Sequence, residues 1–489
     1  MTPGVSNQTG QDEGTVGVYG SVSYTMNGGR VEYNNWELDG GDNMDNGSNG
    51  TLNVYPSIDA IAEFKVLTSN YGAQYGRNGS GTIEVETKSG TNRFHGDVYE
   101  FVRNDMFNAR NYFNSTVPEY KKNDYGYTVG GPVYIPHVFN KDKNNTYFFW
   151  SEEWRKDVVP GQSFHVPVPS LAERGGNFTD ICPGTDCPTV GPIITGLPAF
   201  AANQAVAQAL LTMIPAPTGA NASTCVPGSG SGSNQCFFTA APAQGTNWRE
   251  ELVRVDHNFS DKIRATFRFI HDSWQTTTAV PLWTNQTTFP TIGTAFKGPG
   301  VGLVARLTAT ASPTLLNEFV FSYTADHIIL NDVGNWKRPA GFNAGFTDIF
   351  PGNGQGVLPG VALTDPAGVY GNFGEDAGYI PNGIYNSNPT YTFRDNVNKI
   401  IGKHNLQFGA YIAAAQKNEF GGELSNGSYP GYLSFNPTQF PSGTTGNPFA
   451  DLLLGNIASF GQQNHLLKYY NRYKLFEPIS RMTGALLTA

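Results

Sequence analysis

Apolar and polar residues alternate along the chain from Phe94 onward, in segments of strand length separated by turns and loops. The clearest example covers residues 251–272, where ELVRVDH and KIRATFRFIHD flank a short turn at 258–261. A period of two residues is typical of a β-strand, because successive side chains point to opposite faces. The pattern therefore predicts an antiparallel hairpin with one apolar and one polar face. The two faces of its second arm are Ile263, Ala265, Phe267 and Phe269 against Arg264, Thr266 and Arg268.

Two further hairpins follow the same pattern. VARLTATA and LLNEFVFSYTADH lie on either side of residues 312–314, and YTFRDNVNKI and NLQFGAYIAAAQ lie on either side of residues 401–404. Ahead of the first of these, residues 300–305 (GVGLVA) fit the loose dinucleotide-binding pattern G-x-G-x-x-A. Neither a helix nor a βαβ setting follows them, so we interpret the segment as a loop that enters a strand.

Some connections between the predicted hairpins are very long, as at residues 166–247. In a compact soluble domain most connections have about four to six residues, so this length would argue against the predicted strands. Outer-membrane barrels, in contrast, combine short turns at one rim with long loops at the other. The alternation of loop length therefore favours a barrel. In that case the apolar run ALLTMIP (209–215) is expected to form a short helix inside an external loop.

The first 93 residues differ from the rest of the chain and predict a small α+β unit. Two short strand-like runs, at residues 16–24 and 31–38, lie in sequence rich in Gly and Asn. Beyond them the pattern predicts a helical turn capped by Ser57 and two half-buried strands, at residues 57–62, 63–68 and 82–86.

Composition excludes some classes of protein. Charged residues make up 15% of the chain and the formal net charge is -9, so the basic surface of a nucleic-acid-binding protein is missing. The longest weakly polar run, residues 197–214, is interrupted by Asn203 and Gln204 and is too short for the roughly 20 apolar residues of a spanning helix. A membrane protein with this composition would have to cross with strands, which need only about 9 to 11 residues each.

The four cysteines form two close pairs in loop-like sequence. We expect disulfides Cys182–Cys187 and Cys225–Cys236 in an oxidising compartment, with free thiols as the alternative. Zinc is disfavoured because neither spacing is C-x2-C and no histidine is nearby. The motifs HExxH, G-x-S-x-G and G-x-x-x-x-G-K-[ST] are absent from the sequence, so we expect no enzyme activity, no cofactor and no metal.

One long segment carries a family resemblance. SIDAIAEFKVLTSNYGAQYGRNGSGTIEVETKSGTNRFHGDVYEFVRND (57–105) resembles the junction of plug and barrel in Oar-like TonB-dependent receptors. NNWELDGGDN (34–43) is similar to a plug segment of that family, and GYTVGGPVYIP, YFFWSEEW, SPTLLNEFVFSYT, GKHNLQFGA and NPFADLLLG are similar to its barrel strands and turns. The resemblance implies a mainly β fold, in which a small α+β plug remnant precedes the antiparallel transmembrane strands of an incomplete barrel.

The resemblance also implies three domains: a plug part at 1–93, barrel strands with long external loops at 94–478, and a truncated or aberrant tail at 479–489. The sequence supplies about ten strands, whereas transporters of this type have about 22. A signal peptide and a TonB box are not visible, and ISRMTGALLTA replaces a further strand after Pro478. We therefore expect a fragment of a longer receptor.

The resemblance implies active uptake of a large ligand across the outer membrane of a Gram-negative-type bacterium. The partners would be outer-membrane lipid, the TonB-ExbB-ExbD energy-coupling system through a missing region, and an unknown ligand, namely a metal chelate, a glycan or a peptide. The alternative is a structural or adhesive surface barrel that does not transport.

Two groups of residues are candidates for function. Reversible polar contacts between plug and barrel wall would form a latch, because charges that face a wet lumen exchange partners easily. Ordinary solvated charge is the alternative for these residues, which are Glu63, Arg77 and Lys88 on the plug and Glu100, Arg103, Arg254 and Arg268 on the wall. The second group could bind ligand or Ca²⁺, although its spacing does not fit a calcium loop and a flexible turn is the alternative. Its members are Asp39, Asp42, Asn43 and Asp45.

Overall fold

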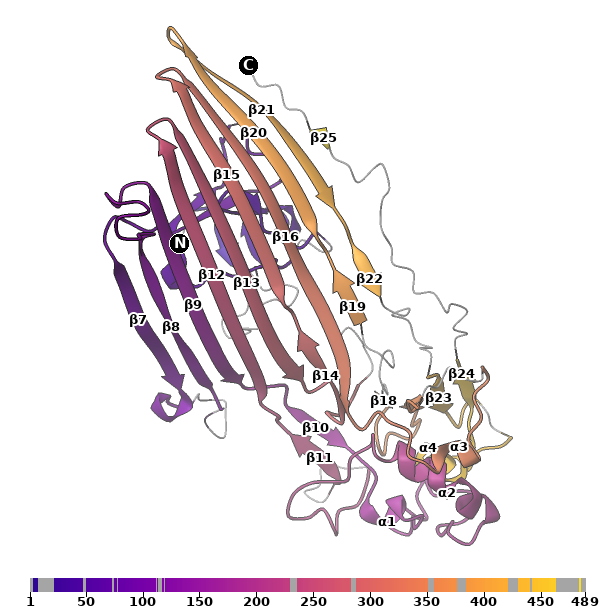
Figure 1. Cartoon of the computed structure of the whole chain (residues 1–489). Helices are drawn as coiled ribbons and strands as arrows, with labels where there is room; N and C mark the ends of the chain where they lie inside the picture. Colours follow the sequence, from indigo (N-terminus) through magenta and orange to yellow (C-terminus); the bar gives the residue numbers. More distant parts are fainter. Residues whose placement is uncertain are drawn as a thin grey trace.

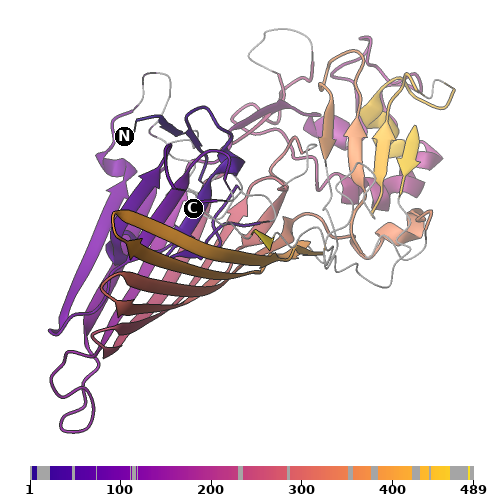
Figure 2. The same cartoon turned by 90° about the horizontal axis from the view of Figure 1, so that it is seen from above.

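The structure is a computed structural model with three parts: a broad curved sheet, a small inner domain on its concave side, and a cap of helices and short strands at one end (Figure 1). Figure 2 shows the sheet curving around the N-terminal segments. The structure describes residues 3–7, 22–46, 50–72, 74–76, 78–110, 112, 117, 119–228, 235–282, 287–350, 356–375, 384–420, 430–439, 442–462 and 483–484.

The curved sheet, called the wall below, is antiparallel throughout its described strands. Two of its strands, β14 (Ile292–Lys297) and β15 (Gly300–Ser312), follow each other end to end and both pair with β13 (Ile263–Thr278) on one side and β16 (Leu315–Gly334) on the other. Its strands are β7 (His95–Asn104), β8 (Lys121–Pro132), β9 (Thr146–Val159), β12 (Gln244–Ser260), β13 (Ile263–Thr278), β14 (Ile292–Lys297), β15 (Gly300–Ser312), β16 (Leu315–Gly334), β19 (Ile384–Ser387), β20 (Thr390–Ile401), β21 (His404–Ala415), β22 (Asn418–Phe420) and β25 (Thr483–Gly484).

The three predicted hairpins are confirmed as β12–β13, β15–β16 and β20–β21. Each strand extends beyond its predicted limits at one end or at both, and the first turn shortens to Asp261 and Lys262. Gly300 is already the first residue of β15, so the glycine-rich segment 300–305 belongs to the strand itself. A mainly β fold with a large antiparallel sheet is therefore correct.

The wall has its polar face on the inside. Thr266 and Arg268 on β13 are 5% and 0% exposed, whereas Phe267 between them is 42% exposed. A soluble sheet would bury the phenylalanine, but a barrel in lipid turns apolar side chains outward and polar ones toward its lumen. On neighbouring outward positions, Phe321 packs against Phe393 in a tilted arrangement, with ring centroids 5.0 Å apart. This arrangement is that of a membrane β-barrel wall.

The inner domain comprises residues 22–90 and has its own four-stranded sheet, in the order β4-β3-β6-β5. Residues 31–38 were expected to form one strand, but a 3-10 turn precedes the strand. Asn34 follows this turn, and its Nδ2 donates hydrogen bonds to the carbonyls of Tyr24 and Val31. Most of the predicted run 16–24 lies outside the described residues. The elements are β2 (Tyr24–Met26), which pairs with β1 (Val5–Asn7), η1 (Val31–Tyr33), β3 (Asn35–Leu38), β4 (Gly41–Asp42), η2 (Ile58–Ala60), β5 (Ile61–Leu67) and β6 (Thr82–Thr87).

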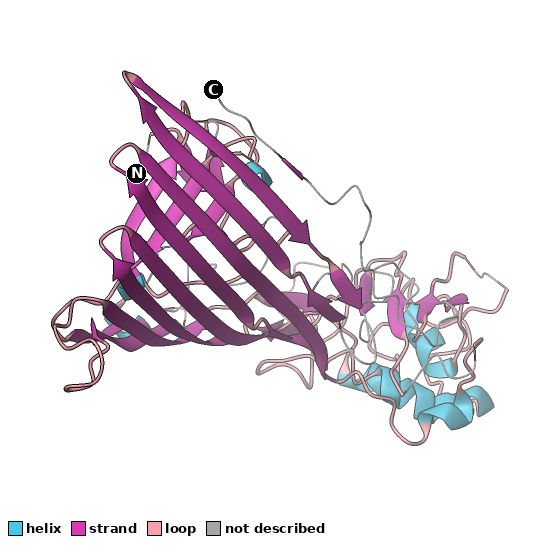
Figure 3. Ribbon diagram, turned by 45° about the horizontal axis from the view of Figure 1, so that its top comes forward, coloured by secondary structure: helices cyan, strands magenta, loops and turns pink. Residues whose placement is uncertain are grey.

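The cap, where the helices gather at one end of the wall in Figure 3, is built from three long connections that share one apolar core. Its apolar core includes Phe178 from the first connection, Phe342 from the second and Phe449 from the third, all fully buried. Disulfides Cys182–Cys187 and Cys225–Cys236 lie in it. Its elements are β10 (Phe164–Pro167), α1 (Leu171–Arg174), α2 (Pro198–Leu210), β11 (Phe237–Ala240), α3 (Phe342–Gly345), β17 (Gly360–Leu363), β18 (Phe373–Glu375), β23 (Tyr432–Phe435), α4 (Pro448–Leu454) and β24 (Ser459–Gly461); η3 (Asp105–Phe107) follows β7.

The helix expected at residues 209–215 lies earlier in the chain. Helix α2 begins at Pro198, which suits a first helical turn because its missing N–H is not needed there. Ala209 and Leu210 end it, and the rest of the run continues as turns. No helix in the described part of the chain is long and apolar enough to cross a membrane.

A buried polar cluster joins the three connections of the cap. Tyr370 donates its hydroxyl to Glu173 Oε1 at 2.8 Å, and Asn447 donates Nδ2 to the Tyr370 hydroxyl at 3.1 Å. Burial, with the nearby charge of Asp180, raises the pKa of Glu173 to about 8. The carboxyl group is therefore protonated at neutral pH, which removes an uncompensated charge from the core of the cap.

Candidate functional site

The contact between inner domain and wall is centred on a tight turn. Asp39 and Gly40 join β3 to β4 with φ angles of 51° and 77°, as a two-residue hairpin turn of type I′ requires. The next residue, Gly41, touches the wall so closely that a Cβ there would lie 2.7 Å from Ser322 Cβ and from Val304 Cγ2. The turn therefore presents Asp39 directly to the wall.

Asp39 is held by two arginines of the wall. Its Oδ2 accepts a hydrogen bond from Arg268 Nε at 3.0 Å, and its Oδ1 accepts one from Arg254 Nη1 at 3.3 Å. Within the inner domain, Thr87 N–H donates to Oδ1 at 2.8 Å. Arg268 also donates Nη2 to the Leu38 carbonyl at 3.0 Å. Asp39 and Arg268 are fully buried.

Electrostatics keep Asp39 ionised in this position. Burial acts to raise the pKa of the carboxyl group, but the charges of Arg268 and Arg254 and the Thr87 N–H together hold it below its ordinary value. A buried ion pair is weak evidence for net stability, because both charges lose their hydration. Removal of one partner is costly, however, since it leaves a buried charge behind. The pair therefore fixes the position of the turn.

Two more ion pairs extend the contact along the wall. Glu86 on β6 pairs with Arg306 on β15 at 2.8 Å, and Glu37 on β3 pairs with Arg394 on β20 at 3.0 Å. Burial raises the pKa of both glutamates, and the charge of the paired arginine offsets this only in part. We call these two pairs, together with Asp39 and its two arginines, the arginine latch.

Neutral hydrogen bonds continue the contact toward the cap. Asn53 donates Nδ2 to Thr324 Oγ1 at 2.9 Å, and the hydroxyls of Ser57 and Ser151 lie 2.8 Å apart. Gly300 of the wall faces this segment, where a Cβ would lie 2.0 Å from the Asn53 carbonyl oxygen. The Ser57 hydroxyl therefore binds the wall and does not cap the following turn, so the predicted cap is wrong and η2 comprises a single 3-10 turn.

The inner domain and the wall also share an apolar core. Val54 of the inner domain packs in one cluster with Phe149, Leu252 and Ile270, which are the inward-facing apolar residues of three neighbouring wall strands. All four are at most 1% exposed. Fully burying side chains of this size contributes about 1.5 to 3 kcal/mol each. The contact therefore combines apolar packing with ion pairs of high geometric specificity.

The structure brings together only some of the predicted latch residues. Arg254 and Arg268 contact the inner domain through Asp39, which the sequence had placed in the other group. Lys88 lies 3.7 Å from Asp59 within the inner domain, and Glu63 is exposed. Arg77 lies outside the described residues.

The remaining predicted latch residues, Glu100 and Arg103, lie on β7 at one end of the described strand order. Both are exposed, and Arg103 packs on the Tyr120 ring at 4.0 Å. The ion pairs of the latch join the inner domain to β12, β13, β15 and β20. Glu37, Glu86, Arg306 and Arg394 were missed, although Glu86 alternates with Val85 on a strand that the sequence did predict.

The group proposed for ligand or Ca²⁺ binding is neither an open loop nor a flexible turn. Asp39, Asp42, Asn43 and Asp45 are at most 4% exposed. Asn43 closes a buried bridge to Val54, donating Nδ2 to its carbonyl at 2.9 Å and accepting from its N–H at 3.1 Å. Asn388 of the wall donates to Asp45 at 2.8 Å. The group thus belongs to the contact with the wall, and no cluster of three metal-binding side chains occurs among the described residues.

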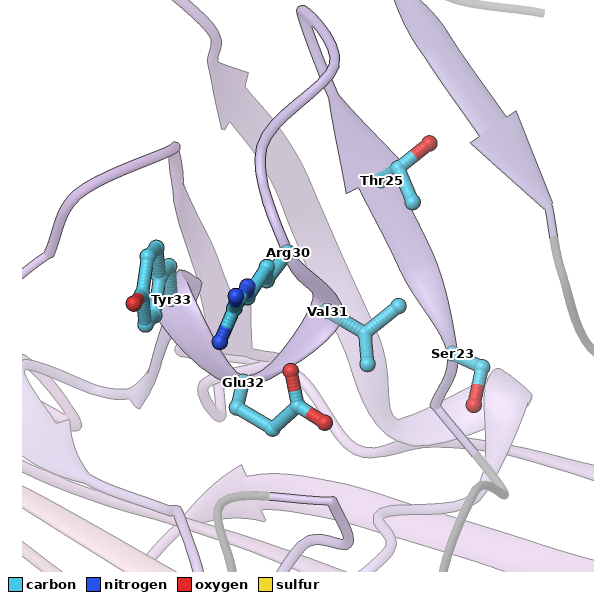
Figure 4. Close-up of a pocket in the computed structure, with 6 residues that line it drawn as sticks. All are labelled: Ser23, Thr25, Arg30, Val31, Glu32 and Tyr33. Carbon is cyan, nitrogen blue, oxygen red and sulfur yellow. The ribbon is translucent and has the colours of Figure 1, made fainter.

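A separate groove lies on the inner domain (Figure 4). The guanidinium of Arg30 stands 5.8 Å from the ring centroid of Tyr33 on one side of it. Polar, charged and apolar side chains line it, namely Ser23, Thr25, Arg30, Val31, Glu32 and Tyr33. The ion pairs of the arginine latch involve none of these residues.

Residues 86–477 match the family model described as an outer membrane beta barrel domain. The TonB-dependent transporter Oar of Myxococcus xanthus is 29% identical over 91 residues, which is 17% of this chain and 9% of that protein. The outer-membrane transporter YddB of Escherichia coli has a similar structure, with 10% identity, a TM-score of 0.48, and coverage of 85% of this chain and 44% of that one.

The siderophore receptor PirA of Acinetobacter baumannii is likewise similar in structure, with 11% identity, a TM-score of 0.42, and coverage of 81% of this chain and 42% of that one. The chain thus spans less than half the length of these two solved structures. The matching family model covers most of this chain, including every long strand of the wall. The protein is therefore located in the outer membrane and belongs to the family of outer membrane β-barrel domains.

Proposed function

We propose that the protein is part of a TonB-dependent receptor that takes up a large ligand across the outer membrane. In this proposal residues 1–93 belong to the plug and residues 94–478 to the barrel, with the cap on the extracellular side. The carrying observation is the buried pair of Asp39 with Arg268 and Arg254, because it joins the inner domain to the wall through separable charged contacts. The likeness to Oar over 91 residues supports the same reading.

The latch suits a plug that has to move. Its charges lie on the inner face of the wall, where water that enters during opening can hydrate them. Each arginine pairs with a carboxylate of the plug in the closed state, and two of them also have a wall carboxylate nearby: Arg254 Nε lies 3.0 Å from Asp256, and Arg394 Nη2 lies 3.9 Å from Glu318. Exchange between these partners lowers the cost of opening.

The test is growth of a deletion strain complemented with the native gene, on iron chelates, glycans and peptides as limiting nutrients. The proposal expects growth on at least one nutrient to depend on the gene and on the TonB-ExbB-ExbD system. Replacement of Asp39 by Asn should alter that growth, whereas replacement of the exposed Glu63 by Gln serves as the matched control. Growth that is independent of the gene on every nutrient would contradict transport.

One observation favours a second candidate, a surface barrel with an adhesive role. The cap folds as a domain with its own core and two disulfides, as binding modules outside the cell often do. If adhesion is the function, removal of the gene should reduce attachment to surfaces or to other cells and leave growth unchanged. The same pair of strains therefore discriminates between the two candidates.

A further inference from the structure

A row of carboxylates crosses the inner face of the wall on the cap side of the arginine latch. Glu250 on β12 lies directly opposite Glu153 on β9 and Asp272 on β13. Asp272 in turn lies opposite Gly300, whose partner on β16 is Asp326. We call these four acidic residues, Glu153, Glu250, Asp272 and Asp326, the carboxylate row.

The row is buried and short of cations. Its members are 3%, 0%, 1% and 8% exposed in the order of the strands. Arg155 pairs with Glu153 at 2.7 Å, but the described residues form no ion pair with the other three. Like charges directly opposite each other on neighbouring strands are destabilising. Ionised together, the carboxyl groups of the row would repel one another across the strands.

Two carboxylate oxygens of the row are buried without a hydrogen-bond partner among the described residues. Glu250 Oε1 and Asp326 Oδ1 are buried and accept no hydrogen bond from a described residue. The other oxygen of Glu250 receives only a long contact of 3.5 Å from the Ser151 hydroxyl. A buried acceptor without a donor is unfavourable, so the two oxygens are available to a donor that the closed state does not supply.

Among the described residues, the inner domain offers this row neutral donors. The Tyr55 N–H donates to Asp272 Oδ2 at 2.8 Å. In the arginine latch, by contrast, the inner domain contributes carboxylates that form ion pairs with arginines of the wall. The acidic and basic positions lie at different heights on the same strand. Glu250 precedes Arg254 by four residues, which is about 13 Å at a rise of about 3.3 Å per residue. A ligand that enters past the cap would meet the carboxylates before the arginines.

We propose that the carboxylate row selects ligands that carry ammonium or guanidinium groups, so that the cargo is a basic peptide. The inference rests on the proposed transport function, since the row becomes accessible only when the plug moves. Three carboxylates without ion pairs favour a cation and repel an anionic chelate. A neutral glycan would gain nothing from their charge. Cationic groups of a peptide would donate to Glu250 Oε1 and Asp326 Oδ1, which have no donor in the closed state.

The test compares uptake of four labelled probes by energised cells that produce the full protein: trilysine, triglutamate, maltotriose and a ferric catecholate chelate. Each is measured with and without an uncoupler, for wild type, for the double variant E250Q/D326N and for the control E251Q. Glu251 follows Glu250 on the strand but points to the opposite face, where it pairs with His271 and Arg249. Surface labelling of the cap verifies equal amounts of folded protein.

Uncoupler-sensitive uptake of trilysine should exceed that of triglutamate by about tenfold or more, as expected for two solvent-accessible charge pairs. The double variant should lose this preference, and E251Q should keep it. Preferred uptake of another probe, or a preference for trilysine that survives in the double variant, would overturn the inference and leave transport intact. If no probe enters in an uncoupler-sensitive manner, the result contradicts transport itself and the inference with it.

Discussion

Asp39 and Arg268 form a salt bridge of 3.0 Å in which both side chains are fully withdrawn from solvent, although 229 residues separate them in sequence. Asp39 lies at the tip of an inner-domain hairpin and Arg268 in the middle of a wall strand. The bridge therefore fixes one folded unit against the other. Its consequences for stability, permeability and transport can be measured separately.

Replacing Arg268 with Gln should destabilise the docking of the inner domain on the wall by up to about 3 kcal/mol. This is the lower end of the range for a broken buried pair, because Arg254 still faces Asp39. Hydrogen exchange at the backbone amides of residues 35–42 reports this change directly. Arg264→Gln is the control, since Arg264 is half exposed and pairs with Asp256 inside the wall. Unchanged exchange in the Arg268 variant would show that the bridge does not hold the hairpin.

Replacing Gly300 with Ala should displace the inner domain by steric contact alone. The new Cβ would lie 2.0 Å from the Asn53 carbonyl oxygen and 2.5 Å from Asp272 Oδ1, so the backbone of residue 53 has to move. We expect higher permeability to large antibiotics, measured as increased sensitivity of cells. Gly245→Ala, also on a wall strand but with nothing within 4 Å, should leave the sensitivity unchanged.

The wall was predictable from the sequence and the cap was not. Alternation with a period of two marks strands such as Ile263–Thr278 without reference to the rest of the chain. The cap depends on packing between residues such as Phe178, Phe342 and Phe449, which come from three separate connections. No local pattern reports that these loops share one core. The long connections therefore read only as external loops.

The sequence predicted which face of the strand the latch arginines occupy, but not the residues with which they pair. Arg268 lies on the polar face that the alternation defines, so its inward position follows from the pattern. Its partner Asp39 lies in a polar, Gly-rich turn, which suggested an exposed loop. Only the register of the wall and the insertion of the hairpin bring the two together. Glu63 and Glu86 both lie on predicted strands, and the sequence did not show which of them faces the wall.

The stability of the cap should fall as the pH rises. The pKa of Glu173 is about 8 in the folded protein and near its ordinary value of 4.5 after unfolding. Between these values only the folded state binds the proton, so stability is lost as pH rises through this window. From pH 6 to pH 9 the loss should be about 2 to 3 kcal/mol. Urea unfolding of the cap, followed by near-UV circular dichroism, measures it.

The control for this pH effect is Glu173→Gln, which cannot ionise. The variant should be less stable than wild type at pH 6, because the amide nitrogen cannot accept the hydrogen bond that Ser170 N–H donates to Glu173 at 2.8 Å. Its stability should nevertheless change little between pH 6 and pH 9. An equal loss in the variant and in wild type would assign the effect to other groups.

Removing the disulfide Cys225–Cys236 should destabilise the cap without affecting the wall. The bond closes a loop with a sequence separation of 11, for which chain entropy gives about 3 kcal/mol. Cys225→Ser with Cys236→Ser should therefore make the cap sensitive to proteases at lower urea concentrations. Exchange at the amides of β12 and β13 should stay as in wild type. Loss of protection in the wall strands would indicate that cap and wall unfold together.

A reversible tether between Ser57 and Ser151 tests the central claim, that an inner domain held against the wall has to move for transport. Their hydroxyl oxygens lie 2.8 Å apart, and both residues are fully buried. Replacing both with Cys changes their shape little and allows a disulfide across the contact. Ser57→Cys alone is the control for the substitution, and wild type with reductant is the control for the native disulfides. Uptake of the nutrient that supports gene-dependent growth should stop in the oxidised double variant and return on reduction. Uptake at the wild-type rate, with the cross-link verified by mass spectrometry, would contradict the account.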